Sequence, residues 1–207
     1  ALATHKVASV ALGIGATFRH AREKSLDKKL VVYILLTGMP GVILGANLIL
    51  QIDDRLAEMA LGILTLSLGV YSIFKKNLGQ TAEEKNRDLN GYLVGGVVLF
   101  AIGILNGSLT SGTGLFVTLW LIRWFGLDYK MAVTYTLILV GMFWNGSGAI
   151  TLGILGEIKW DWLPVLIAGS LLGGYAGAHL AITKGNKWIK RGFETVAILI
   201  GTKLIFG

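Results

Sequence analysis

Residues Leu30 to Leu50 form an unbroken run of 21 residues without a charged side chain. An α-helix of this length is about 30 Å long, which matches the hydrocarbon core of a lipid bilayer. The composition agrees, because 54% of the residues are hydrophobic and 15% are charged, whereas soluble domains have about 25% charged residues. The sequence therefore predicts an all-α integral membrane protein and excludes a water-soluble single domain.

Further apolar segments predict the other membrane helices. Three of them are long, namely Leu56 to Phe74, Met131 to Leu152 and Trp162 to Ile182. Four are shorter or contain charges: the opening segment up to Phe18, Gly91 to Gly107, Thr113 to Phe125 and Ile189 to Phe206.

The net charge of +7 is unevenly distributed between the connections. Basic residues gather in the segments Arg19 to Lys29, Lys75 to Arg87 and Lys184 to Arg191, while acidic residues lie in the connections between them. Cytoplasmic loops of membrane proteins are enriched in Lys and Arg. We therefore interpret the positive charge as an orientation signal with these loops in the cytoplasm, and we expect no nucleic-acid partner.

The two halves of the chain resemble each other at an offset of roughly 130 residues. Thr4 aligns with Thr134, Gly41 with Gly173 and Gly45 with Gly177. The loop Arg19 to Lys29 is predicted inside and its counterpart, Gly153 to Asp161, outside, so the halves have opposite orientations. Inverted repeats of this kind are typical of secondary transporters.

This repeat predicts the organisation of the chain. Residues 1–76 form a first repeat with three transmembrane helices, residues 77–90 a cytoplasmic linker, and residues 91–207 a second repeat with a broken helix pair and three transmembrane helices. Because the broken pair has no counterpart in the first half, we expect a matching element of roughly 35 to 40 residues before Ala1.

The segment 106–114 interrupts two apolar stretches with glycines and hydroxyl side chains. Non-helical backbone at membrane depth is tolerated where it lines a cavity, and a helix that begins near Thr113 directs free N–H groups at an anion. A solvated extracellular turn is the alternative. The residues of this segment that we expect to bind the substrate are Asn106, Ser108, Thr110, Ser111, Gly112 and Thr113.

Polar residues of the other helices are expected to complete this site near the pseudo-symmetry axis. They are Thr4, Lys6, Thr134, Thr136 and Asn145. Lys6 would balance the charge of an anion, since a lysine inside a membrane segment is costly without a partner. Alternatively, the Lys6 side chain extends to the membrane interface, where its ammonium is solvated. A second set, Gly41, Gly45, Gly173 and Gly177, is expected to allow close helix packing.

Metal and enzyme chemistry have little support in the sequence. The chain has no Cys, and its three His residues show no ligand spacing with one another or with carboxylates. No acid pair or activated nucleophile can be assembled from the predicted spans. We expect neither a cofactor nor a metal site, and no enzymatic activity.

The order of these motifs resembles the TauE/SafE sulfite exporter family. The resemblance rests on Thr4, on Gly41 to Ala46, on Gly107 to Gly114 and on Gly173 to Ala178, although Leu115 and Phe116 stand where the family usually continues with glycines. It implies a multi-pass permease of the bacterial inner membrane with two related halves, associated with sulfite, sulfonates and other small sulfur-containing or organic anions.

Together these features predict a secondary transporter that moves a small anion by alternating access. A channel-like pore for a small neutral solute and a non-transporting scaffold subunit are the alternatives. The expected partners are the anionic substrate and the lipid bilayer, with assembly into a homo-oligomer left open.

Overall fold

The computed structural model describes residues 2–21, 23, 26–48, 54–108, 112–155 and 158–207. Within these ranges the secondary structure is helical, with no strand. The first half contains α1 (Leu2–His20), α2 (Lys28–Leu48) and α3 (Asp54–Phe74). The rest contains α4 (Leu89–Ser108), α5 (Thr113–Phe125), α6 (Tyr129–Tyr135), η2 (Thr136–Trp144), α7 (Asn145–Leu155), η3 (Trp160–Trp162), α8 (Leu163–Lys184) and α9 (Asn186–Phe206).

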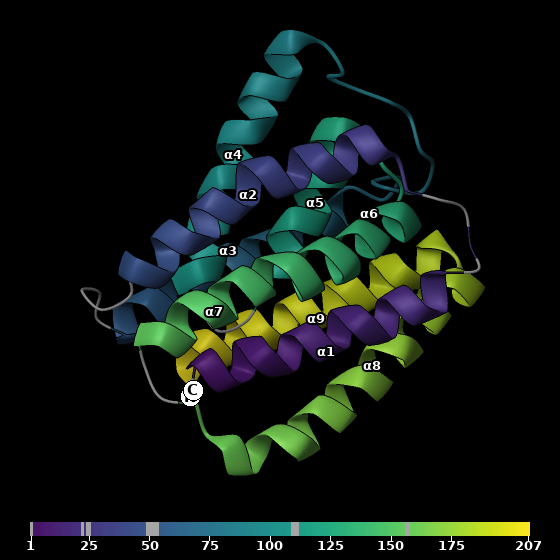
Figure 1. Cartoon of the computed structure of the whole chain (residues 1–207). Coiled ribbons are helices and arrows are strands. Elements are labelled where there is room, and N and C mark those ends of the chain that lie inside the picture. Colours follow the sequence, from purple (N-terminus) through teal and green to yellow (C-terminus); the bar gives the residue numbers. More distant parts are fainter. Residues whose placement is uncertain (1, 22, 24–25, 49–53, 109–111, 156–157) are drawn as a thin grey trace.

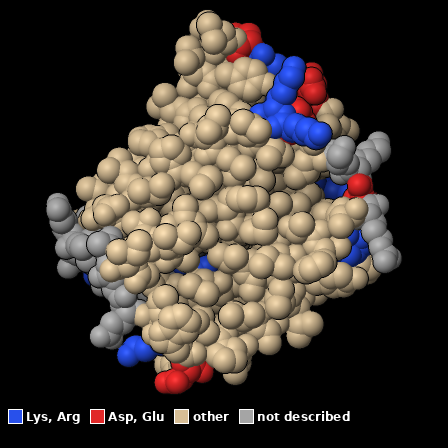
Figure 2. Space-filling view, viewed as in Figure 1, with Lys and Arg blue, Asp and Glu red and all other residues tan. Residues whose placement is uncertain are grey.

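Several of these helices are long and apolar enough to cross a membrane. They are Lys28–Leu48, Leu89–Ser108, Tyr129–Ile154 and Trp160–Lys184, while Glu58–Phe74 and Thr113–Phe125 are apolar but shorter. Figure 2 shows a broad uncharged surface across one face, with Lys, Arg, Asp and Glu gathered at its margins. The predicted class, an all-helical membrane protein, is confirmed.

The segment predicted as one helix over Met131 to Leu152 has an unusual centre. It begins as α6, passes through the π-helical turns of η2 and continues as α7. Asp128 caps its start by accepting a hydrogen bond from the Met131 N–H at 2.8 Å. Because π-helical turns are rare and often occur at functional sites, the residues next to η2 are candidates for a functional site.

Helix α2 packs against α4 along its glycines. A Cβ at Gly41 would lie 2.2 Å from the carbonyl oxygen of Phe100, and one at Gly45 would lie 2.0 Å from that of Ile104. No side chain fits at these distances, so the two backbones can approach this closely only because both residues are glycine. This contact is the close packing that the sequence predicts for Gly41 and Gly45.

Helix α8 makes its close contact one position away from the predicted one. A Cβ at Gly173 or Gly177 would meet no atom within 4 Å, whereas one at Gly174 would lie 2.1 Å from the carbonyl oxygen of Leu12 in α1. The packing role predicted for Gly173 and Gly177 is therefore wrong in the described part of the chain. Residues one apart on a helix differ in direction by about 100°, so the neighbouring glycine faces α1.

The helices form a single layered bundle in which segments from both halves lie side by side (Figure 1). Helix α1 packs against η2 and α7, and α3 packs against α9. Each pair joins an element of the first predicted repeat to its counterpart in the second, as a pseudo-two-fold axis would require. The inversion itself and the boundaries 1–76, 77–90 and 91–207 remain predictions.

Candidate functional site

The most unusual buried group is the ammonium of Lys6 in α1. Its residue is 1% exposed, and Nζ donates hydrogen bonds to the main-chain oxygen of Asn106, to Asn106 Oδ1 at 3.1 Å and to Asn145 Oδ1 at 3.2 Å. Among the described residues, no carboxylate forms an ion pair with it. Lys6 is therefore held inside the bundle by neutral oxygens alone.

Asn106 links Lys6 to the break between α4 and α5. Its Nδ2 donates to Thr113 Oγ1 at 2.8 Å, and both residues are buried. Gly112 precedes α5 with a φ of 89°, a left-handed conformation that favours glycine. No side chain caps the start of α5. The Leu115 N–H donates to the Gly112 carbonyl at 2.9 Å, so the first-turn groups that can meet an acceptor are the N–H groups of Thr113 and Gly114.

A cavity of about 760 Å³ adjoins this break, between the start of α5 and helices α8 and α9. Gly112 and Gly114 line it, together with Thr118 and Thr136, whose hydroxyls are 2.9 Å apart. The rest of the lining is mainly apolar and comes from α6, η2, α8 and α9. The start of α5 therefore contributes to both places, Thr113 to the Lys6 cluster and Gly112 and Gly114 to the cavity, while Lys6 itself does not line the cavity.

Two buried polar side-chain atoms of interest have no hydrogen-bond partner among the described residues. Thr65 in α3 is fully buried, and its Oγ1 would lie 3.6 Å from a Cβ at Gly112. The Nε1 of Trp144, which directly precedes Asn145, is also buried and unpaired. Buried polar groups are nearly always paired, so these two groups are unusual, but neither side chain lines the cavity, and the Trp144 ring packs against Gly38.

The structure brings together only part of the predicted site. Lys6, Asn106, Thr113 and Asn145 form one hydrogen-bonded cluster, and Gly112 and Thr136 line the adjoining cavity. Ser108 is buried beside them, but its hydroxyl donates to the Ile104 carbonyl of its own helix at 2.9 Å. Thr110 and Ser111 lie outside the described residues.

The predicted convergence of Thr4 and Thr134 is wrong. Thr4 Oγ1 accepts a hydrogen bond from the Lys159 N–H at 2.9 Å, whereas Thr134 Oγ1 lies 3.2 Å from His20 Nε2, at the opposite end of α1. Sixteen residues of helix separate Thr4 from His20, which is about 24 Å. The cause is antiparallel packing: α1 runs against the α6–α7 segment, so residues near the start of each are at opposite ends.

A second buried lysine was missed as a functional candidate. Lys190 in α9 donates to Glu194, to the Ser72 carbonyl and to Ser72 Oγ at 3.0 Å. The Ser72 hydroxyl lies 2.9 Å from Glu194 Oε1 and 2.8 Å from the Tyr129 hydroxyl. Arg191, which precedes Glu194 by three positions, lies over the Trp188 ring. The i, i+4 spacing of Lys190 and Glu194 was the available signal.

A bundle of apolar helices with an interrupted pair and a buried ammonium beside the interruption defines the class of protein as a helical membrane transporter. Comparisons with known proteins agree. The chain belongs to the sulfite exporter TauE/SafE family, which matches residues 1–204.

Curated relatives extend over the whole chain. A "probable membrane transporter protein" of Haemophilus influenzae is 27% identical over 207 residues, which cover all of this chain and 80% of the relative. The "probable membrane transporter protein YfcA" of Escherichia coli K12 is 26% identical and covered to 76%, and YdhB of Bacillus subtilis, with the same description, is 23% identical and covered to 84%. No solved structure matches.

Proposed function

We propose that the protein moves a small anion, such as sulfite or a sulfonate, across the bacterial inner membrane by alternating access. The observation that carries this proposal is the buried Lys6 ammonium, which has only neutral oxygens around it. An uncompensated cation in a low-dielectric interior attracts a negative charge strongly. The family and the relatives' names support a transporter, and the choice of an anion comes from this site.

The neighbouring groups suit the oxygens of such an anion. At the start of α5 the N–H groups of Thr113 and Gly114 are the ones we expect to reach an anion, since the Leu115 N–H donates to the Gly112 carbonyl. The Thr65 hydroxyl, 3.6 Å from a Cβ at Gly112, has no partner among the described residues. The cavity has hydroxyls near the break and apolar side chains elsewhere, which fits an organic sulfonate as well as an inorganic oxyanion. In this conformation Lys6 is buried and does not line the cavity, so we expect the break to move when the site opens.

Uptake into proteoliposomes tests this proposal. Vesicles with the purified chain are compared for flux of sulfite, a small alkyl sulfonate, acetate and glycerol. We expect saturable flux of at least one sulfur-containing anion and none of glycerol above protein-free vesicles. Flux that does not saturate and ignores charge would favour the neutral-solute pore. No flux, with a stoichiometric second protein in the purification, would favour the scaffold subunit.

A further inference from the structure

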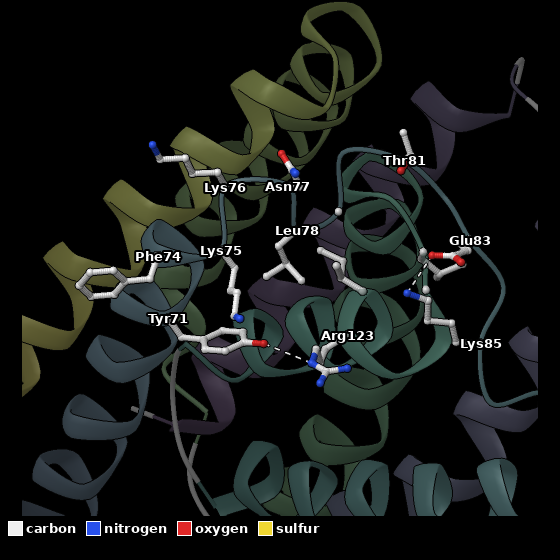
Figure 3. Close-up of a pocket in the computed structure, with 14 residues that line it drawn as sticks. Tyr71, Phe74, Lys75, Lys76, Asn77, Leu78, Thr81, Glu83, Lys85 and Arg123 are labelled. Atoms are coloured by element: carbon white, nitrogen blue, oxygen red, sulfur yellow. Dashed lines mark hydrogen bonds and ion pairs between the residues drawn. The ribbon is translucent and has the colours of Figure 1, made fainter.

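A second hollow, of about 550 Å³, lies at the ends of α3 and α5, away from Lys6. Its lining comes from the last turn of α3, the connection that follows it and the last turn of α5 (Figure 3). The connection belongs to the predicted cytoplasmic linker region, so this hollow faces the cytoplasmic side in the predicted topology.

Positive charge dominates this hollow. Figure 3 shows the Lys75 ammonium and the Arg123 guanidinium on either side of the Tyr71 hydroxyl, while the Lys76 side chain points away from them. Arg123 Nε donates to the Tyr71 hydroxyl at 3.2 Å, which orients the guanidinium and leaves its other N–H groups free for an acceptor.

The one carboxylate among the lining residues is already paired. Glu83 Oε2 lies 2.8 Å from Lys85 Nζ, and the hydrogen bond from Lys85 lowers the pKa of Glu83. In the described part of the chain, neither Lys75 nor Arg123 has a carboxylate partner. Two cations therefore face one space without a counter-charge.

The position of the hollow relates it to the membrane surface. Helices α3 and α5 are apolar and end beside it, and Phe74, which also lines it, is 79% exposed. Aromatic residues at helix ends anchor a protein at the level of lipid headgroups. Basic pockets between membrane helices on the cytoplasmic side are suited to anionic headgroups.

We infer that this hollow binds the phosphate group of an anionic phospholipid from the cytoplasmic leaflet. The Arg123 guanidinium can donate two parallel hydrogen bonds to phosphate oxygens, and Lys75 adds a point charge. Free phosphate has the same chemistry, but the exposed Phe74 beside the hollow gives a lipid chain an apolar contact that a free ion lacks.

Binding of short-chain lipids to the purified full chain in detergent tests this inference. The probes are dihexanoyl phosphatidylglycerol, dihexanoyl phosphatidylcholine and inorganic phosphate. The variants are Lys75→Ala with Arg123→Ala, Lys75→Ala alone, and, as the matched control, Lys187→Ala, an exposed lysine that does not line the hollow. We expect phosphatidylglycerol to bind at least about tenfold more tightly than the other probes. We expect the double variant to lose about 30-fold in that affinity, Lys75→Ala about fivefold, and Lys187→Ala less than about twofold.

Three results would overturn the inference. One is equal affinity for phosphatidylglycerol and phosphatidylcholine. Another is unchanged phosphatidylglycerol binding in Lys75→Ala, a change of an exposed side chain that needs no refolding of the core. The third is inorganic phosphate binding as tightly as the lipid and displacing it, which would assign the hollow to a soluble anion.

Discussion

Replacement of Lys6 by Met is expected to reduce saturable anion flux on the order of 100-fold. Methionine keeps the length and apolar stem of lysine but removes the ammonium that three oxygens of Asn106 and Asn145 hold inside the bundle. Loss of one partner from a buried charge interaction costs about 3 kcal/mol, which corresponds to about this factor. The measurement is kcat/KM for the transported anion in proteoliposomes.

The control for this change is Lys76→Met, which removes an exposed ammonium outside the proposed site. The control is expected to transport like the unchanged chain. Lys6→Met is expected to elute as a single species and to unfold at a similar temperature, since neutral apolar replacements of buried ionic groups are often tolerated. A folded Lys6→Met variant with unchanged anion kinetics would remove Lys6 from the site.

Replacement of Glu194 by Gln is expected to lower the unfolding temperature by about 10 °C. The change leaves the buried Lys190 ammonium without a counter-charge, since the new amide and the two Ser72 oxygens are neutral acceptors. Breaking a buried ion pair from one side costs about 3 to 5 kcal/mol, and 1 kcal/mol shifts the midpoint of a chain of this size by about 2 to 4 °C. The measurement is thermal unfolding of the purified protein in detergent.

Two comparisons make this result specific. In the double variant Lys190→Met, Glu194→Gln, no charge is left unpaired, so most of the lost stability should return. In Glu23→Gln, the exposed Arg19–Glu23 pair at 3.4 Å is removed, and a shift of about 2 °C or less is expected. If the Glu194→Gln and Glu23→Gln midpoints fall by the same amount, the buried cluster does not stabilise the bundle.

Much of the fold could be predicted because the bilayer imposes a simple requirement. Apolar runs such as Leu30 to Leu50 must be helical when no water can satisfy the backbone, and the described part of this run lies within α2 (Lys28–Leu48). The same requirement predicts that Lys6, Asn106 and Asn145 share one site, since a polar side chain in an apolar span must contact other polar groups.

The remaining parts of the site depend on helix packing that no local pattern encodes. Thr65 is a single hydroxyl in an apolar helix, and only the contact between α3 and the break makes it notable. No sequence pattern in Thr136–Trp144 distinguishes the π-helical turns of η2 from an ordinary α-helix. Thr4 and Thr134 were placed together by their repeat relationship, but opposite helix directions put them at opposite ends of α1.

Labelling of a single cysteine at Thr113 tests the central claim, a substrate site at the α4–α5 break with alternating access, most directly. The chain has no native cysteine, so Thr113→Cys in proteoliposomes gives one thiol beside Asn106 and Gly112. We expect slow modification by an impermeant thiol reagent from either side, and further slowing by a transported sulfonate, which does not react with such reagents. Rapid modification from one side only, unaffected by the sulfonate, would contradict it.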